Sequence, residues 1–153
     1  MAEETQRLPY VDEHATIVAA DRERTWESLL RVAEGFVSGP GAPQFARLVG
    51  CADLAPAGPR PLAVGSVVPG FHIAVADPGA ELAMVGSHRF SNYALVFHLD
   101  SLDSGGTRVR AETRAEFPQL RGAIYRALVI GTRMHVLATR RVLGAVKRNA
   151  ERA

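Results

Sequence analysis

The sequence predicts an α+β fold in which a curved antiparallel sheet wraps around a long C-terminal helix, and two short helices follow the first strand. Residues 107–117 alternate between charged side chains and small or apolar ones, which is the pattern of a strand with one wet and one buried face. Residues 119–152 contain no proline and fit one long helix. Residues 62–100 contain turn signals between short apolar runs, which predicts a strand meander. Such a sheet, covered on one face by a helix, encloses space, so the sequence favours a pocket.

Length and composition indicate one domain held together by packing. The chain has 153 residues, of which 47% are hydrophobic and 22% charged, and this suits a single globular core. We expect a flexible N-terminal arm over 1–11 and one domain over 12–152. The single cysteine, Cys51, excludes an intramolecular disulfide and a cysteine-rich zinc site. No segment resembles a signal peptide or reaches the roughly 20 apolar residues of a membrane span, so we expect a cytoplasmic protein.

The N-terminal third predicts a strand and then two short helices. Residues 14–20 form a short apolar run, and Asp21 suits the N-cap of the helix that follows. Four apolar residues then share one helix face at the i, i+3, i+4, i+7 spacing: Trp26, Leu29, Leu30 and Ala33. Glycine and proline at 39–41 end this helix, and a second one fits 43–49. Residues 51–61 suit either a loop or a short edge strand.

The meander divides into two faces. Proline and glycine between Asp77 and Ala80 suit a tight turn, which predicts that these two residues pair. A second turn at Phe90-Ser91 places His88 directly opposite Tyr93. Extending both registers gives a bulky and mostly apolar face that we expect to lie against the helix: Phe71, Ile73, Val75, Leu82, Met84, Gly86, His88, Tyr93, Leu95, Phe97 and Leu99.

The closing helix has a cationic face and an apolar face. Basic residues recur every seven positions at Arg126, Arg133, Arg140 and Lys147, which predicts an exposed stripe. The opposite face is predicted to pack on the sheet: Ile124, Leu128, Gly131, His135, Ala138 and Val142. The small residues on this face allow close approach to the sheet or leave room beneath the helix.

This order of elements resembles the START-like superfamily, also called SRPBCC or Bet v 1-like, which includes polyketide cyclases, lipid-transfer domains and plant hormone receptors. The resemblance rests on the first strand and the helix with Trp26, the approach from Gly65 to Phe71, the strand 93–99, the strand 107–117 and the helix through His135. It covers about residues 12–150. It implies the helix-grip fold and a deep, largely apolar cavity for a hydrophobic small molecule. We expect the following residues to line that cavity: Phe71, Ile73, Met84, His88, Tyr93, Leu95, Phe97, Thr113, Leu128, Gly131 and His135.

His88, Tyr93 and His135 are the polar groups expected at this cavity. An imidazole beside a phenol can orient a carbonyl or transfer a proton, as a cyclase or dehydratase requires. The structural alternative is that His135 hydrogen-bonds within the core and that Tyr93 keeps its hydroxyl at the pocket mouth. Thr113 contributes either a hydroxyl group to the cavity wall or only packing contacts.

Several other kinds of site are not expected. His72 and His98 are predicted on the outer face about 12 Å apart, which is too far to share a metal ion, so we predict no metal and no cofactor. The motifs of phosphate loops and of the hydrolase elbow do not occur in the sequence. Glu112 and Glu116 interrupt the arginines of the last strand, so we expect no nucleic-acid partner. The helix arginines suit a solvated surface, and binding to acidic lipids would need an exposed apolar strip beside them.

The leading functional hypothesis is the binding of a hydrophobic small molecule, such as a lipid or polyketide, between the sheet and the C-terminal helix. The first alternative is an enzyme of the polyketide cyclase or dehydratase kind that uses His135, His88 or Tyr93. The second is a non-catalytic interaction module whose cavity is filled by its own side chains. A ligand cavity normally has several hundred Å³, so its volume distinguishes the last hypothesis from the others. The sequence is compatible with a monomer and with an oligomer.

Overall fold

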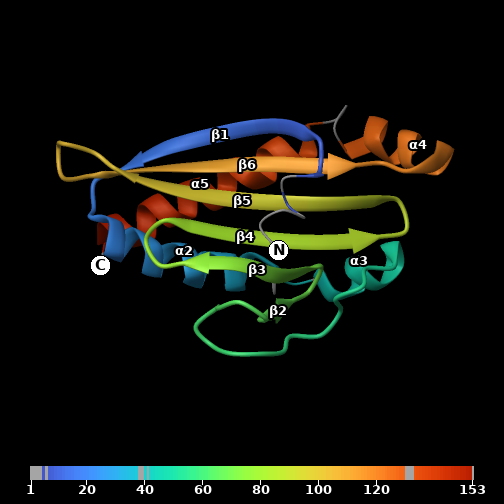
Figure 1. Ribbon diagram of the computed structural model, residues 1–153, viewed down its shortest axis with the longest axis horizontal. Coiled ribbons are helices and arrows are strands. Elements are labelled where there is room, and N and C mark those ends of the chain that lie inside the picture. The colour runs from blue at the N-terminus through green and yellow to red at the C-terminus, as the bar shows by residue number, and fades with distance from the viewer. Residues whose placement is uncertain (1–4, 6, 38–39, 41, 130–132, 153) are drawn as a thin grey trace.

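The computed structural model describes residues 5, 7–37, 40, 42–129 and 133–152. Within these residues, antiparallel pairs join six strands into one sheet of order β1-β6-β5-β4-β3-β2, and helices lie behind it and at one end (Figure 1). The elements in chain order are β1 (Tyr10–Val18), α2 (Arg22–Val37), α3 (Ala42–Val49), β2 (Val67–Val68), β3 (Phe71–Asp77), β4 (Glu81–His88), β5 (Ser91–Ser101), β6 (Thr107–Glu116), α4 (Gln119–Val129) and α5 (Met134–Arg152). The predicted α+β fold is confirmed.

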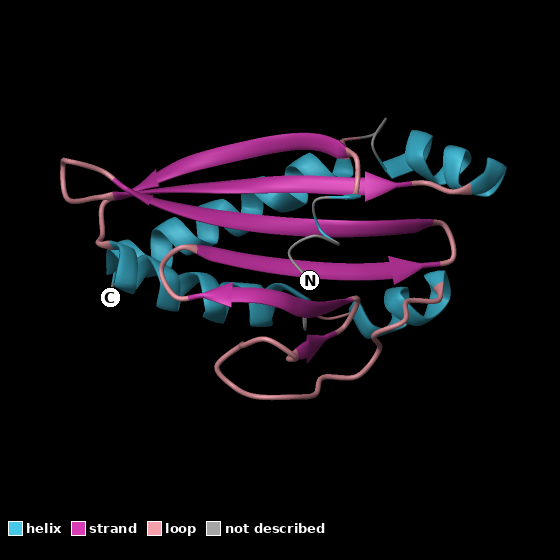
Figure 2. Ribbon diagram, viewed as in Figure 1, coloured by secondary structure: helices cyan, strands magenta, loops and turns pink. Residues whose placement is uncertain are grey.

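The core lies between one face of the sheet, here called the inner face, and helices α2 and α5. Figure 2 shows both helices running behind the strands. The most deeply buried large side chains come from nearly every element of these two layers: Val18, Leu29, Ile73, Leu82, Met84, Phe97, Val109 and Val146. The hydroxyl of Ser28 donates to the carbonyl of Val146 at 2.9 Å and so joins α2 to α5.

Helix α2 begins where the sequence predicts. The Asp21 carboxylate accepts the backbone N–H of Arg24 at 2.8 Å, which satisfies one of the free donors of the first turn. Trp26, Leu29 and Ala33 are buried against the sheet. Helix α3 also forms as predicted, and the segment after it is a loop with one isolated bridge, between Ala57 and Val67.

The register of the β3–β4 hairpin differs from the prediction near its turn. Asp77 pairs with Glu81 rather than with Ala80, because Ala80 stays in the turn and donates its N–H to the Asp77 carbonyl at 2.9 Å. A bulge after Ile73 restores the predicted pairing of Ile73 with Met84. As a result Val75 packs with the outer-face cluster, and its predicted place on the inner face is wrong.

The β4–β5 hairpin turns one residue earlier than predicted, at Arg89-Phe90. His88 therefore pairs with Ser91 and Tyr93 pairs with Gly86, so the predicted pairing of His88 with Tyr93 is wrong. The shift moves each partner by two positions, and side chains on a strand repeat every two positions. The predicted faces are therefore confirmed for β4 and β5, and His72 and His98 lie outside in ion pairs with Asp53 and Glu81.

The C-terminal helix is not continuous. It is divided into α4 and α5, and Arg133, which precedes α5, has a left-handed backbone with φ of 57°. Such a conformation cannot continue a right-handed helix, so the two helices do not keep one common apolar face. Ile124 and Leu128 are 69% and 64% exposed, and their predicted burial is wrong. In α5 Val142 is buried as predicted, whereas Ala138 is only half-buried.

The N-terminal segment covers part of the outer face of the sheet. Leu8 is buried in a cluster of small apolar residues from β3, β4 and β5, namely Ala74, Ala83, Val85, Ala94 and Val96. The Leu8 carbonyl accepts from the Arg114 guanidinium at 3.0 Å, and the Pro9 carbonyl accepts the N–H of Ala115 at the same distance. These contacts explain why the outer face carries alanines and valines at positions that water would otherwise reach.

Candidate functional site

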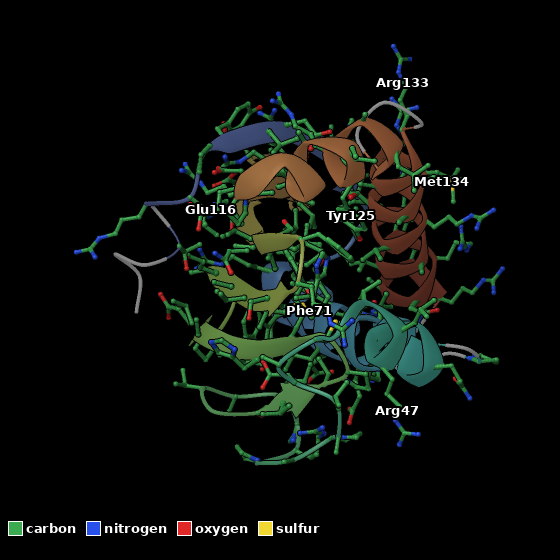
Figure 3. All side chains as sticks on the ribbon, turned by 90° about the vertical axis from the view of Figure 1, so that its right-hand side faces the viewer. Arg47, Phe71, Glu116, Tyr125, Arg133 and Met134 are labelled. Carbon is green, nitrogen blue, oxygen red and sulfur yellow. The ribbon has the colours of Figure 1, made fainter. Side chains whose placement is uncertain are left out.

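The inner face of the sheet is sealed at one end and half-open at the other. On β5, Phe97 and Leu99 are fully buried, whereas Leu95 and Tyr93 are half-buried. Burial of the inner-face side chains decreases toward the same end on the other strands. The half-buried inner-face residues there are Phe71 on β3, His88 on β4 and Thr113 on β6. Figure 3 looks at this end, where Phe71 and Tyr125 lie between the sheet and the helices. We refer to this region as the half-open end.

An aromatic cluster occupies one side of the half-open end. The His88 ring lies 5.3 Å from the Tyr93 ring and 4.8 Å from the Tyr125 ring, measured between centroids. Phe71 meets Tyr93 edge-on at 5.1 Å, and Phe90 stacks on Tyr125 at 5.5 Å. Tyr125 comes from α4, so this helix contacts the sheet through aromatic rings.

Tyr93 is held in place by a hydrogen bond and by a glycine beneath its ring. Its hydroxyl donates to the Gly70 carbonyl at 2.7 Å and lies 3.8 Å from the Cys51 sulfur. A Cβ on Gly86 would lie 2.1 Å from the Gly70 oxygen and 2.6 Å from the Tyr93 ring, so only glycine fits there. Burial, together with the Cys51 thiol, raises the pKa of Tyr93, and the phenol therefore stays protonated.

His88 is a neutral imidazole in this environment. The backbone N–H of Phe90 donates to its Nδ1 at 3.1 Å, which places the ring proton on Nε2. Burial lowers the pKa of His88, in agreement with this assignment. Among the residues that the structure describes, Nε2 has no hydrogen-bond partner, so the imidazole can offer a hydrogen-bond donor to a molecule at the half-open end.

The other side of the half-open end carries a carboxylate between two imidazoles. Asp12 pairs with Thr113 across β1 and β6, and His14 pairs with Ala111, so both face inward. The Nε2 atoms of His135 and His14 lie 2.8 and 3.2 Å from Asp12 Oδ2. Asp12 Oδ1 and Thr113 Oγ1 are buried and have no hydrogen-bond partner among the described residues. Buried polar atoms are normally paired, which makes this a candidate ligand position.

The sequence matches no known protein-family model and no curated protein, whereas the structure is similar to solved structures. The Zhui aromatase/cyclase from Streptomyces sp. R1128 aligns with a TM-score of 0.61 and 16% identity over 95% of each chain. A Nitrosospira multiformis protein aligns with a TM-score of 0.56 and 17% identity, over 92% of this chain and 94% of its own. Ara h 8.0201 aligns with a TM-score of 0.55 and 8% identity, over 91% and 95%. This chain has a START-like, or Bet v 1-like, fold. At these identities the likeness establishes the fold alone.

Most of the residues predicted to contact a ligand lie on the inner face of the START-like sheet. Those at the half-open end are Phe71, His88, Tyr93, Leu95 and Thr113, and those in the sealed core are Ile73, Met84 and Phe97. His135 lies at the start of α5 beside Asp12. Leu128 is exposed on α4, and Gly131 lies outside the described residues. Their contact with a ligand stays a prediction.

Four residues of the candidate site were not predicted from the sequence: Asp12, His14, Cys51 and Tyr125. A signal for the first two exists in the sequence, because positions 12, 14, 16 and 18 share one face of a strand and Val18 is apolar. No signal places them opposite Thr113, since that pairing joins distant strands. In the part of the chain that the structure describes, no group of three or more His, Cys, Asp or Glu side chains is arranged to hold a metal ion.

A separate cavity of about 380 Å³ lies at the edge where the start of β1 and the end of β6 meet α4. Its lining includes Tyr10, Val11, Phe117, Ala123 and Arg126. None of the residues predicted to contact a ligand lines it. It therefore does not contain the candidate site, although Phe117 also contacts the Tyr125 ring at 6.4 Å.

Proposed function

We propose that this START-like protein binds a hydrophobic small molecule that carries a hydroxyl group, such as a polyketide phenol or a hydroxylated lipid, at the half-open end. The observation that carries the proposal is the pair of buried, unpartnered oxygens, Asp12 Oδ1 and Thr113 Oγ1, beside the imidazoles of His14 and His135. An unpaired buried polar group destabilises a protein by about 1 to 3 kcal/mol. A ligand hydroxyl that donates to the carboxylate and accepts from Thr113 removes this penalty.

The apolar part of the ligand is expected to lie along Leu95, Phe71 and the aromatic cluster. These side chains are half-buried without a ligand, so a bound molecule would remove more of their surface from water. Each 100 Å² of apolar surface so removed contributes about 2.5 kcal/mol. His88 Nε2 and the protonated phenol of Tyr93 supply polar groups at the other end of the same space, which suits a molecule with a carbonyl or a second hydroxyl.

The test is native mass spectrometry of the purified protein, followed by titration with palmitic acid, a hydroxylated fatty acid and a hydroxyanthraquinone. We expect the hydroxylated compounds to bind more tightly. Thr113→Val should weaken their binding about fivefold, since one hydrogen bond is worth about 1 kcal/mol, and leave palmitic acid unaffected. Thr16→Val, on the same face of the neighbouring strand β1, serves as the matched control. If no compound binds and none co-purifies, the proposal fails and the interaction module with a filled cavity remains.

A second candidate function is proton transfer, as in a polyketide cyclase or dehydratase. The observation that favours it is the 2.8 Å contact between His135 Nε2 and Asp12 Oδ2. A carboxylate in this position fixes the orientation of the imidazole ring, which is how an acid–base histidine is commonly supported. His88 and Tyr93 would then orient the substrate carbonyl.

The variant His135→Gln separates this function from simple binding. Glutamine keeps a hydrogen-bonding group but exchanges no proton near neutral pH, so conversion of a bound compound should fall by about 10² to 10⁴. Affinity should fall by no more than about tenfold. His98→Gln on the outer face is the control. Binding without conversion in the wild-type protein would exclude the enzyme and leave a carrier or sensor.

A further inference from the structure

The separate cavity at the edge of the sheet combines aromatic walls with two charged groups of opposite sign. Its volume is about 380 Å³, which is in the range of small-molecule sites. Tyr10 and Phe117 supply aromatic rings, Glu116 supplies a carboxylate and Arg126 supplies a guanidinium. The other described residues that line it are aliphatic. Figure 3 shows Glu116 beside α4, the helix that carries Arg126.

The two charges are not neutralised by the described part of the chain. Arg126 has no hydrogen bond or ion pair with any described residue. Glu116 Oε1 accepts from the neutral amide of Asn92 at 2.5 Å, and its carboxylate forms no ion pair with a described residue, Arg126 included. Both side chains are exposed, so a ligand can reach them. A positive and a negative charge therefore line one cavity without pairing.

We propose that this cavity binds an aromatic amino acid or a molecule of the same chemistry, namely an aromatic ring that carries one carboxylate and one ammonium group. The Arg126 guanidinium can donate two parallel hydrogen bonds to a carboxylate. The Glu116 carboxylate can accept from the ammonium group. The ring of the ligand would lie against Tyr10 and Phe117, because aromatic rings attract one another in offset and edge-on arrangements.

Ligands with fewer charges use the cavity less completely. A purely anionic molecule would meet Glu116 as a like charge, and a purely cationic molecule would meet Arg126 in the same way. An uncharged hydrocarbon would remove water from both groups and give neither a partner. A zwitterion is the class of ligand that pairs both charges.

This site is next to the half-open end and does not depend on it. Ala115 lines the cavity and pairs with Tyr93 across β6 and β5, and the Phe117 ring lies 6.4 Å from the Tyr125 ring. None of the residues assigned to the hydroxylated ligand lines the cavity. The inference therefore goes beyond the proposed function and stands if no hydroxylated ligand is found.

NMR titration of the ¹⁵N-labelled protein tests the proposal with three compounds of one carbon skeleton. L-Phenylalanine carries both charges, 3-phenylpropionate carries only the negative charge, and 2-phenylethylamine carries only the positive charge. We expect phenylalanine to give saturable shifts at residues 10–11, 115–117 and 123–126. Each singly charged analogue should bind at least about tenfold more weakly, because one charge of the cavity stays unpaired.

Two variants assign the charges. Arg126→Gln should weaken the binding of phenylalanine and phenylpropionate about tenfold and spare phenylethylamine. Glu116→Gln, which keeps an acceptor for the Asn92 amide, should weaken phenylalanine and phenylethylamine and spare phenylpropionate. The matched controls are Arg140→Gln on α5 and Glu27→Gln on α2, which are exposed and lie outside the cavity. Both should bind phenylalanine like the wild type.

Three results would overturn the proposal. The first is the absence of saturable shifts with phenylalanine, even where a hydroxylated compound binds at the half-open end. The second is equal affinity for the three compounds, since the charges would then not select the ligand. The third is a set of shifts confined to residues 93–95 and 113, which would place phenylalanine at the half-open end.

Discussion

At the scale of single residues, Gly86 controls the aromatic side of the site. Its Cα lies against the Gly70 carbonyl and the Tyr93 ring, and an added methyl group would overlap both. We expect Gly86→Ala to displace Tyr93, break its hydrogen bond to Gly70 and lower the free energy of unfolding by about 2 to 3 kcal/mol. Urea denaturation measures this.

The matched glycine is Gly35 in α2, where an added Cβ meets nothing within 4 Å. Gly35→Ala should raise the free energy of unfolding by about 0.5 to 1 kcal/mol, because alanine is the better helix former. If both variants change stability by the same amount and in the same direction, the close approach at Gly86 does not determine the position of Tyr93.

His88 gives the stability of the protein a defined dependence on pH. Burial lowers the pKa of the folded imidazole, whereas the unfolded chain titrates near its ordinary value of about 6.5. Below that pH the unfolded state binds more protons than the folded state, so the free energy of unfolding falls as pH falls. We expect this loss between about pH 7.5 and 5.5 to be smaller in His88→Gln.

The outer-face variant His72→Gln is the control for this pH dependence. His72 contacts Asp53 on the opposite side of the sheet and does not contact the aromatic cluster, so this variant shows how much of the change in slope comes from the loss of any imidazole. Chemical denaturation at several pH values provides the measurement. A slope that His88→Gln leaves unchanged would show that burial of this imidazole does not link stability to pH.

At the scale of elements, the division of the C-terminal helix determines which leucines stabilise the fold. Leu143 in α5 is 3% exposed and Leu128 in α4 is 64% exposed. We expect Leu143→Ala to cost about 2 to 5 kcal/mol and Leu128→Ala less than about 0.5. Thermal and urea unfolding of the two variants compares the same chemical change at both positions. Equal costs would mean that α4 packs on the sheet as α5 does.

The strand faces were predictable and the interruption of the helix was not. A hairpin register that is wrong by two positions still places Met84 and Phe97 on the correct face, because side chains alternate with a period of two. A wrong prediction within a helix is not corrected in this way. One residue with a left-handed backbone, such as Arg133, changes the orientation of the helix that precedes it, and so changes which of its side chains face the sheet. The apolar stripe at Ile124 and Leu128 fits a continuous helix, and the one local signal of the break is Gly131, a residue type that is common at helix ends.

At the scale of the whole molecule, the acid–imidazole part of the site depends on contacts between distant segments. Asp12 and His135 are separated by 123 positions and meet only because β1 pairs with β6 while α5 crosses behind them. Periodicity predicts which residues share a face, but it gives no information about which strands become neighbours. The position of His135 on the helix face toward the sheet was therefore predictable, and its carboxylate partner was not.

The whole molecule also divides into a stable part and a part that opens easily, and hydrogen exchange should reveal both. Helix α5 buries Thr139, Val142, Leu143, Val146 and Ala150, whereas the exposed side chains of α4 provide few buried contacts. Local opening needs less free energy where few apolar contacts are lost. We therefore expect amides of residues 119–129 to exchange at least about 100-fold faster than those of the second half of α5.

A bound ligand should protect a defined segment in the same measurement. A hydroxylated ligand should slow exchange at the beginning of β5 and the end of β6, where Tyr93 and Thr113 lie. The same ligand should leave exchange in the sealed half of the sheet unchanged. Protection by the ligand that appears only in α2 and the end of α5 would place the binding site in the sealed core, away from Asp12 and His88.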